Sequence, residues 1–360
     1  MKVQQLKIGN TTARTPIVQG AMGVRVSLAS LAAAVANEGG IGTIASVGIG
    51  DIELSKQEYE KQSREALALE IRKAKQMTDG PLAVNVMAAL SNADDLVRTS
   101  VSEGVQMIVM GAGIPGRLPE VVADNSVALV PIVSSKRVAE LILRMWHSRY
   151  HRTADALVLE GPLAGGHLGF SDEQLKQPEA YSLERLLSEI LTAVKPYEDK
   201  YGVKVPVIAA GGIYDGHDIC RMLSLGASGV QMATRFVCTQ ECDVSKEFKQ
   251  AYLDAKEEDI VIVNSPLGMP GRAIRNEFLR TVERQEKLKI ACPYRCLSVC
   301  KASESQYCIA KALLNSYHGD VDHGLIFCGK NAYRVKEITT VRQIMAELME
   351  EVSHCQPQER

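Results

Sequence analysis

Short apolar runs alternate with longer amphipathic segments along the first two-thirds of the chain. The runs are rich in Val, Ile, Leu and Ala and are bounded by Gly, Pro or polar residues, which is typical of buried parallel strands. The eight predicted strands are Pro16–Gln19, Ile41–Ala45, Leu82–Met87, Met107–Met110, Ala128–Val133, Ala156–Leu159, Val205–Ala209 and Gly229–Met232.

Helical periodicity fills the intervals between these runs and returns near the end of the chain. The predicted helices are Leu28–Glu38, Lys56–Met77, Ala93–Glu103, Val138–Tyr150, Ser182–Lys195, Asp218–Leu225 and Val341–Val352. This alternation predicts an α/β fold, a (β/α)8 TIM barrel, with an open doubly wound sheet as the alternative.

The alternation stops after the eighth strand. Residues from about 245 onward are more polar and helical in pattern. We predict that residues 1–244 and 324–360 form the barrel, and that residues 245–323, termed the lid, form a smaller, mostly helical domain over its C-terminal face.

Composition narrows the class of protein. The 360 residues are 46% hydrophobic and carry a formal net charge of −2, so neither a nucleic acid nor a membrane is expected as a partner. No apolar run approaches the ~18 residues of a membrane-spanning helix. Nine cysteines without a secretory signal favour a reducing cytoplasm over a disulfide framework.

A glycine-rich loop, Gly161–Gly169, follows the sixth predicted strand and contains His167. Chemistry in parallel α/β folds is placed at this end of the strands. The alternative is a simple turn with a solvated histidine. Similar small-residue loops follow strands seven and eight, where (β/α)8 enzymes often bind phosphate through backbone N–H groups. Gly211, Gly212, Ala233 and Thr234 are the phosphate candidates, unless these are only tight turns.

Two further features suit a flat ligand. The small residues of Gly20–Gly23, after the first strand, let a planar ring approach the backbone. Asn85, on the third strand, offers an amide to a ring carbonyl or imide, although barrel asparagines are as often structural caps.

Six stretches in this order resemble the nitronate monooxygenase family, formerly called 2-nitropropane dioxygenases, which includes FMN-dependent enoyl-acyl-carrier-protein reductases. The resemblance covers about residues 10–280 and 324–350. The stretches that carry it are Pro16–Gly23, Asn85, Ala164–His167, Ala210–Ile213, Gly229–Arg235 and Gly271–Asn276.

The resemblance implies an FMN-containing barrel with His167 as the catalytic histidine. Glu160 stands where the family often has Gln; a carboxylate there is unfavourable beside an anionic reduced flavin, so Glu160 is expected to point away or to be protonated. The residues implied at the FMN site are Ala21, Met22, Gly23, Asn85, Glu160, Gly165, Gly211, Gly212, Gln231, Met232, Ala233 and Thr234.

Four cysteines lie close together in the lid: Cys292, Cys296, Cys300 and Cys308, with the spacing C-x3-C-x3-C-x7-C. On a helix the first three share one face. An iron–sulfur cluster, or less readily zinc, is one interpretation; small buried residues in a packed helix are the other. We interpret the remaining cysteines as unpaired thiols, with Cys328 near the flavin. These are Cys220, Cys238, Cys242, Cys328 and Cys355.

Three functions follow. The first is an FMN-dependent oxidation of alkyl nitronates or nitroalkanes by O2, with His167 as the base or as a hydrogen-bond donor to the nitronate. The second is an NAD(P)H-dependent enoyl-thioester reductase. The third is an electron-transfer flavoprotein with an iron–sulfur cluster in the lid. We also expect the substrate to be a small molecule and the protein to lie in the cytoplasm. Both a monomer and a homodimer are compatible with the sequence.

Overall fold

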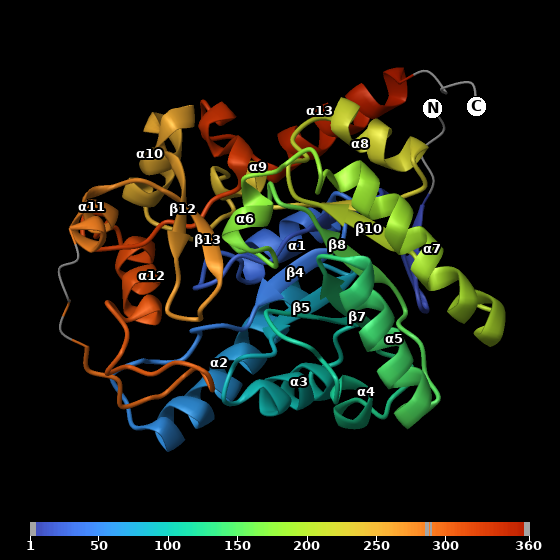
Figure 1. Ribbon diagram of the computed structural model, residues 1–360, viewed down its shortest axis with the longest axis horizontal. Coiled ribbons are helices and arrows are strands. Elements are labelled where there is room, and N and C mark those ends of the chain that lie inside the picture. The colour runs from blue at the N-terminus through green and yellow to red at the C-terminus, as the bar shows by residue number, and fades with distance from the viewer. Residues whose placement is uncertain (1–4, 285–287, 289, 356–360) are drawn as a thin grey trace.

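Eight parallel strands form a barrel, which a bridge between Val18 and Ile41 closes. The computed structural model, drawn in Figure 1, describes residues 5–284, 288 and 290–355. The strands are β3 (Ile17–Gln19), β4 (Gly42–Ala45), β5 (Leu82–Met87), β6 (Met107–Gly111), β7 (Ala128–Val133), β8 (Leu157–Glu160), β10 (Val207–Ala210) and β11 (Gly229–Met232). β3 pairs with β11 on one side, and on the other the N–H of Gln19 donates to the carbonyl of Ile41 (2.9 Å), just before β4. The TIM-barrel prediction is confirmed, and the open sheet is excluded because the first and last strands meet.

A ring of helices surrounds the barrel. They are α1 (Ala29–Asn37), α2 (Lys56–Met77), α3 (Ala93–Ser102), α4 (Leu118–Val121), α5 (Lys136–Tyr150), α7 (Leu183–Tyr201), α8 (Gly216–Ser224) and α13 (Val341–His354). Two one-turn helices, α6 (Asp172–Leu175) and α9 (Thr234–Val237), lie in the loops that follow β9 and β11. Local sequence sets their starts: Ser55 and Glu58 form a capping box at α2. After the lid, α13 packs between α8 and α1 and completes the ring.

The barrel interior is filled by aliphatic side chains such as Val18, Ala83, Val130 and Ile208. A short hairpin, β1 (Leu6–Ile8) and β2 (Thr11–Ala13), adds three more buried side chains to this inner cluster. The hairpin was not predicted. It closes the N-terminal end of the barrel, so a cavity can form only toward the C-terminal end.

The lid is less helical than predicted. It contains α10 (Lys246–Asp254), a 3-10 turn, η1 (Glu257–Asp259), α11 (Glu277–Glu283) and α12 (Ile309–Tyr317), but also a hairpin of β12 (Ile260–Asn264) and β13 (Pro270–Ile274). β13 also pairs with β9 (Gly166–His167), so the lid shares a three-stranded sheet with the glycine-rich loop. The β-branched residues of β12 favour a strand, but the run has only five residues and is flanked by polar ones, so the sequence pattern did not identify it. Parts of the predicted domain ranges, residues 1–4, 285–287, 289 and 356–360, lie outside the described residues.

The interpretation of Cys220 and Cys355 as unpaired thiols is wrong, and the helix considered for the four clustered cysteines does not form. Cys220 and Cys355 form a disulfide that joins α8 to the end of α13, two helices that pack side by side. The stretch from Cys292 to Cys308 consists of turns and bends rather than a helix. In the part of the chain that is described, no helix combines the length and apolarity needed to cross a bilayer.

Candidate active site

A cavity of 460 Å³ opens at the C-terminal end of the barrel, beneath the lid. Strand register explains its lining. Ala210 pairs with Glu160 on one neighbour and with Gln231 on the other, so the three side chains lie on the same face as the barrel interior. The inward positions are thus apolar deep in the barrel and polar at its mouth.

All thirteen residues predicted for the flavin and the base line this one cavity: Ala21, Met22, Gly23, Asn85, Glu160, Gly165, His167, Gly211, Gly212, Gln231, Met232, Ala233 and Thr234. Cys328, expected near the flavin, lines it as well. Of the four clustered cysteines, only Cys296 reaches it.

His167 is held by the lid. Its Nε2 lies 2.7 Å from Ser265 Oγ, in the turn between β12 and β13, and its ring packs edge-on against Phe327 with centroids 5.1 Å apart. Burial lowers the pKa of His167 to about 4, so the imidazole is neutral near pH 7. Ser265 Oγ already accepts the N–H of Leu267. If Nε2–H also donates to this oxygen, the lone pair of Nδ1 is left to accept a proton.

Three polar side chains at the barrel mouth have no hydrogen-bond partner among the described residues: Asn85, Glu160 and Gln231. Burial raises the pKa of Glu160 to about 7. Glu160 lines the cavity, and with this pKa about half of the carboxyl groups are protonated at pH 7. Polar groups left unpaired inside a cavity favour a polar ligand there.

The loops after β10 and β11 form a cradle of backbone N–H groups. Gly212 has a φ of +87°, a left-handed conformation that favours glycine, and a β-carbon there would lie 3.0 Å from Leu163. In the described chain, no hydrogen bond uses the N–H of Gly212, Ala233 or Thr234. Such groups suit a phosphate without a charged side chain.

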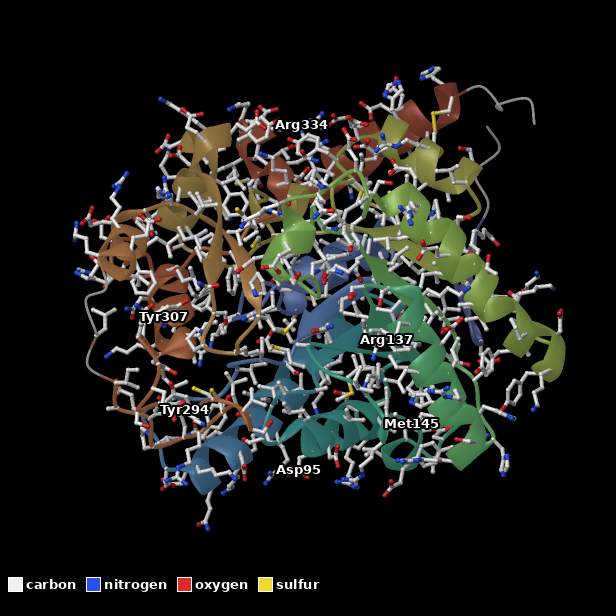
Figure 2. All side chains as sticks on the ribbon, in the orientation of Figure 1. Asp95, Arg137, Met145, Tyr294, Tyr307 and Arg334 are labelled. Atoms are coloured by element: carbon white, nitrogen blue, oxygen red, sulfur yellow. A yellow bond between two sulfur atoms is a disulfide. The ribbon has the colours of Figure 1, made fainter. Side chains whose placement is uncertain are left out.

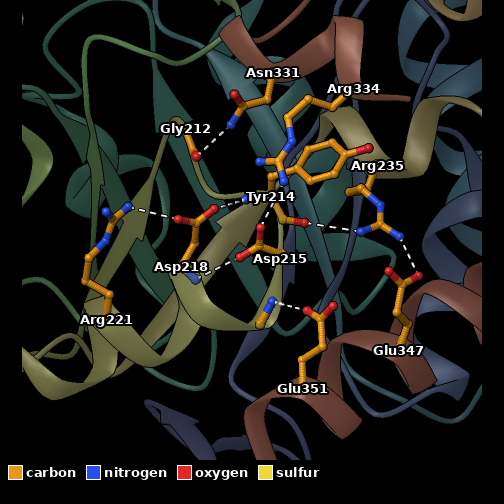
Figure 3. A network of polar contacts seen from close by, with 11 residues as sticks. Gly212, Tyr214, Asp215, Asp218, Arg221, Arg235, Asn331, Arg334, Glu347 and Glu351 are labelled. Carbon is orange, nitrogen blue, oxygen red and sulfur yellow. Dashed lines mark hydrogen bonds and ion pairs between the residues drawn. The ribbon is translucent and has the colours of Figure 1, made fainter. Parts of the chain in front are cut away.

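A polar network fixes the β10 loop (Figure 3). The Asn331 amide donates to the Gly212 carbonyl (2.8 Å), and the Tyr214 ring lies between Arg334 and Arg235, whose guanidinium carbons are 4.0 and 4.9 Å from its centroid. Arg334 also pairs with Asp215 (3.0 Å). The cations near the cradle are thus already engaged, so a phosphate there would depend on the backbone N–H groups.

Sequence reasoning missed three residues that place His167. Ser265 and Phe327 lie about 100 residues or more further along the chain, and only the fold brings them to the ring. Arg272, buried on β13, donates to the Ala164 carbonyl in the glycine-rich loop. The pairing of β13 with β9 brings these residues to His167, and this pairing cannot be recognised from the spacing of residues in the sequence.

Known proteins resemble this chain over most of its length. A probable nitronate monooxygenase from Staphylococcus saprophyticus is 27% identical and covers 79% of this chain and 82% of its own. FabK from Thermotoga maritima superposes with a TM-score of 0.74 and 29% identity over 95% of this chain and 93% of its own.

A (3aS,4S,5R,7aS)-5-hydroxy-7a-methyl-1-oxo-octahydro-1H-indene-4-carboxyl-CoA dehydrogenase from Mycobacterium tuberculosis is 32% identical over 74% of this chain. The match spans only 65% of that relative's length. The family model described as nitronate monooxygenase matches residues 4–351. The chain therefore belongs to the nitronate monooxygenase family and is an oxidoreductase.

Proposed function

We propose that the chain is an FMN-dependent enzyme that oxidises alkyl nitronates or nitroalkanes with O2, and that His167 handles the substrate proton. The observation that carries this proposal is the neutral, partly buried His167, which lines the same cavity as three unpaired polar groups and a backbone N–H cradle. A probable nitronate monooxygenase among the relatives supports the substrate class.

The lining residues fit FMN. The N–H groups of Gly212, Ala233 and Thr234 would hold its phosphate, and Asn85 and Gln231 would pair with the polar edge of its ring system. When bound, FMN supplies the two-electron or one-electron acceptor that these side chains lack. Glu160 in its protonated form adds no negative charge to the site.

His167 provides the proton chemistry. For a neutral nitroalkane, the α C–H bond breaks, its proton moves to Nδ1, and its electron pair forms the C=N bond of the nitronate. The negative charge of the nitronate then favours the imidazolium, which offsets the cost of burial. For a substrate supplied as the nitronate, the other neutral tautomer serves: Nε2 accepts the Ser265 hydroxyl, and Nδ1–H donates a hydrogen bond to a nitronate oxygen.

Two experiments test the proposal. In an anaerobic titration, propane-2-nitronate should bleach the bound flavin, whereas NADH and NADPH should not. In His167→Asn, kcat/KM for the neutral nitroalkane should fall by about 10²–10⁴-fold, and that for the nitronate should fall less, with FMN content unchanged. Unchanged turnover of both substrates would refute the role of His167.

A thioester reductase is the second candidate. The relative from M. tuberculosis is named a carboxyl-CoA dehydrogenase, and the similarity to FabK also supports this alternative. Bleaching by NADH or NADPH, followed by reoxidation with an enoyl-CoA, would favour it. An electron-transfer flavoprotein would need a second redox centre, for which the four lid cysteines are the candidates.

A further inference from the structure

The four lid cysteines surround a second cavity. Cys292, Cys296, Cys300 and Cys308 all line a space of 700 Å³ beside α2. Each is a free thiol, and only Cys296 is fully buried. Thiols that served only as small packing residues would fill space rather than border a cavity, so packing alone does not account for this arrangement.

The spacing of the sulfur atoms is too wide for a single ion. A tetrahedral zinc ion, with Zn–S bonds of about 2.3 Å, holds its sulfurs about 3.8 Å apart. Among the described residues, no three of these sulfurs lie within 4.8 Å of one another. They nevertheless face one common space, because all four cysteines line the same cavity. Four thiols around a wider centre are typical of an iron–sulfur cluster.

Neighbouring groups suit a negatively charged centre. The Tyr294 hydroxyl lies 2.6 Å from Cys308 Sγ, and Ser305 Oγ lies 3.8 Å from Cys300 Sγ. Lys56 and Arg295 line the same cavity, whereas no described Asp or Glu does. Tyr294 packs against Tyr59 of α2, with centroids 5.6 Å apart, and it lies on the lid side of the molecule (Figure 2). Hydrogen bonds to the sulfurs and nearby cations stabilise thiolate-bound clusters.

The two cavities share a wall. Cys296, Leu297, Ile309 and Ala310 line both the cysteine cavity and the candidate active site. A centre bound by the cysteines would therefore lie next to the candidate active site, across these shared residues.

We propose that Cys292, Cys296, Cys300 and Cys308 bind an iron–sulfur cluster against the wall of the active-site cavity. The proposal is independent of the nitronate activity, because it rests on the lid cysteines and is tested by composition rather than turnover.

The experiment measures iron, zinc and acid-labile sulfide in the full chain purified without oxygen. We expect about two to four iron atoms per chain with matching sulfide, and an electron paramagnetic resonance signal after dithionite reduction. Cys300→Ser and Cys308→Ser should each lower the iron content at least about tenfold. Cys242→Ser is the matched control, because this free thiol lies outside both cavities and bonds the Val26 carbonyl, which serine can also do.

Tyr294→Phe keeps all four thiols and so does not depend on the serine variants folding. It should retain iron but lower the reduction potential, because the hydrogen bond to Cys308 is lost. Iron below about a tenth of an atom per chain, both as purified and after anaerobic reconstitution with ferrous iron and sulfide, would overturn the proposal. One zinc ion per chain in place of iron, or iron unaffected by both serine variants, would overturn it as well.

Discussion

Glu160 gives a quantitative test of the cavity's electrostatics. Its side chain ends β8 at the mouth of the barrel and has no hydrogen-bond partner among the described residues. Burial raises its pKa from the usual 4.5 to about 7, so the folded chain holds this proton more tightly than the unfolded chain does. The contribution of Glu160 to the free energy of unfolding is therefore greatest below pH 4.5, where the carboxyl group is protonated in both the folded and the unfolded chain. It declines as the pH rises from 4.5 to 7 and is lost above pH 7.

The magnitude follows from the pKa difference. Each pH unit between the two pKa values is worth about 1.4 kcal/mol, so ionised Glu160 costs about 3 kcal/mol of folding free energy above pH 7. Glu160→Gln has nearly the same shape and does not ionise. The quantity to compare is the free energy of unfolding of the variant minus that of the wild type, both without bound flavin. This difference should be larger at pH 8.5 than at pH 4.5, by up to about 3 kcal/mol in favour of the variant.

Urea unfolding followed by circular dichroism measures this difference. The titration of His167, whose pKa burial lowers, affects both proteins alike and cancels in the comparison. Glu337→Gln, which makes the same substitution at an exposed position, is the matched control. A variant-to-wild-type difference that stays constant from pH 4.5 to 8.5 would mean that Glu160 is well solvated, and the reasoning would fail.

Three other substitutions probe the site. Ser265→Ala should lower nitroalkane turnover about tenfold by releasing the His167 ring, whereas Ser265→Thr should restore it, as steady-state kinetics across pH would show. Gly212→Ala should weaken FMN binding in fluorescence titrations, whereas Gly202→Ala, at another left-handed glycine with open space around it, should not. Arg272→Met should destabilise the chain by about 1–3 kcal/mol in urea, since it leaves a buried carbonyl unpaired.

The barrel was predictable because its strands are unusually apolar. Each barrel strand is covered on both faces, so the sequence carries runs such as Ala128–Val133 that stand out from the helices around them. The hairpins β1–β2 and β12–β13 are short and depend on tertiary pairing, so local pattern does not reveal them.

The loops of the candidate site were predictable for a related reason. Glycine and small residues at strand ends mark close approach of the backbone, and they lie where the barrel places its ligands. The contacts of His167 with Ser265 and Phe327 were not, since 98 residues separate His167 from Ser265. The Cys220–Cys355 disulfide was missed because its partners are 135 residues apart.

The sheet shared by the lid and the glycine-rich loop links the position of the lid to the position of His167. His167 is itself a strand residue of that sheet, paired with Gly271 of β13, and its ring is fixed by a residue of the β12–β13 turn. A movement that lifts the hairpin away from the barrel would break that pairing and the bond to Ser265 together. If His167 transfers the proton as proposed, an open lid would leave its ring without this support, so substrate entry and proton transfer would take place in different positions of the lid.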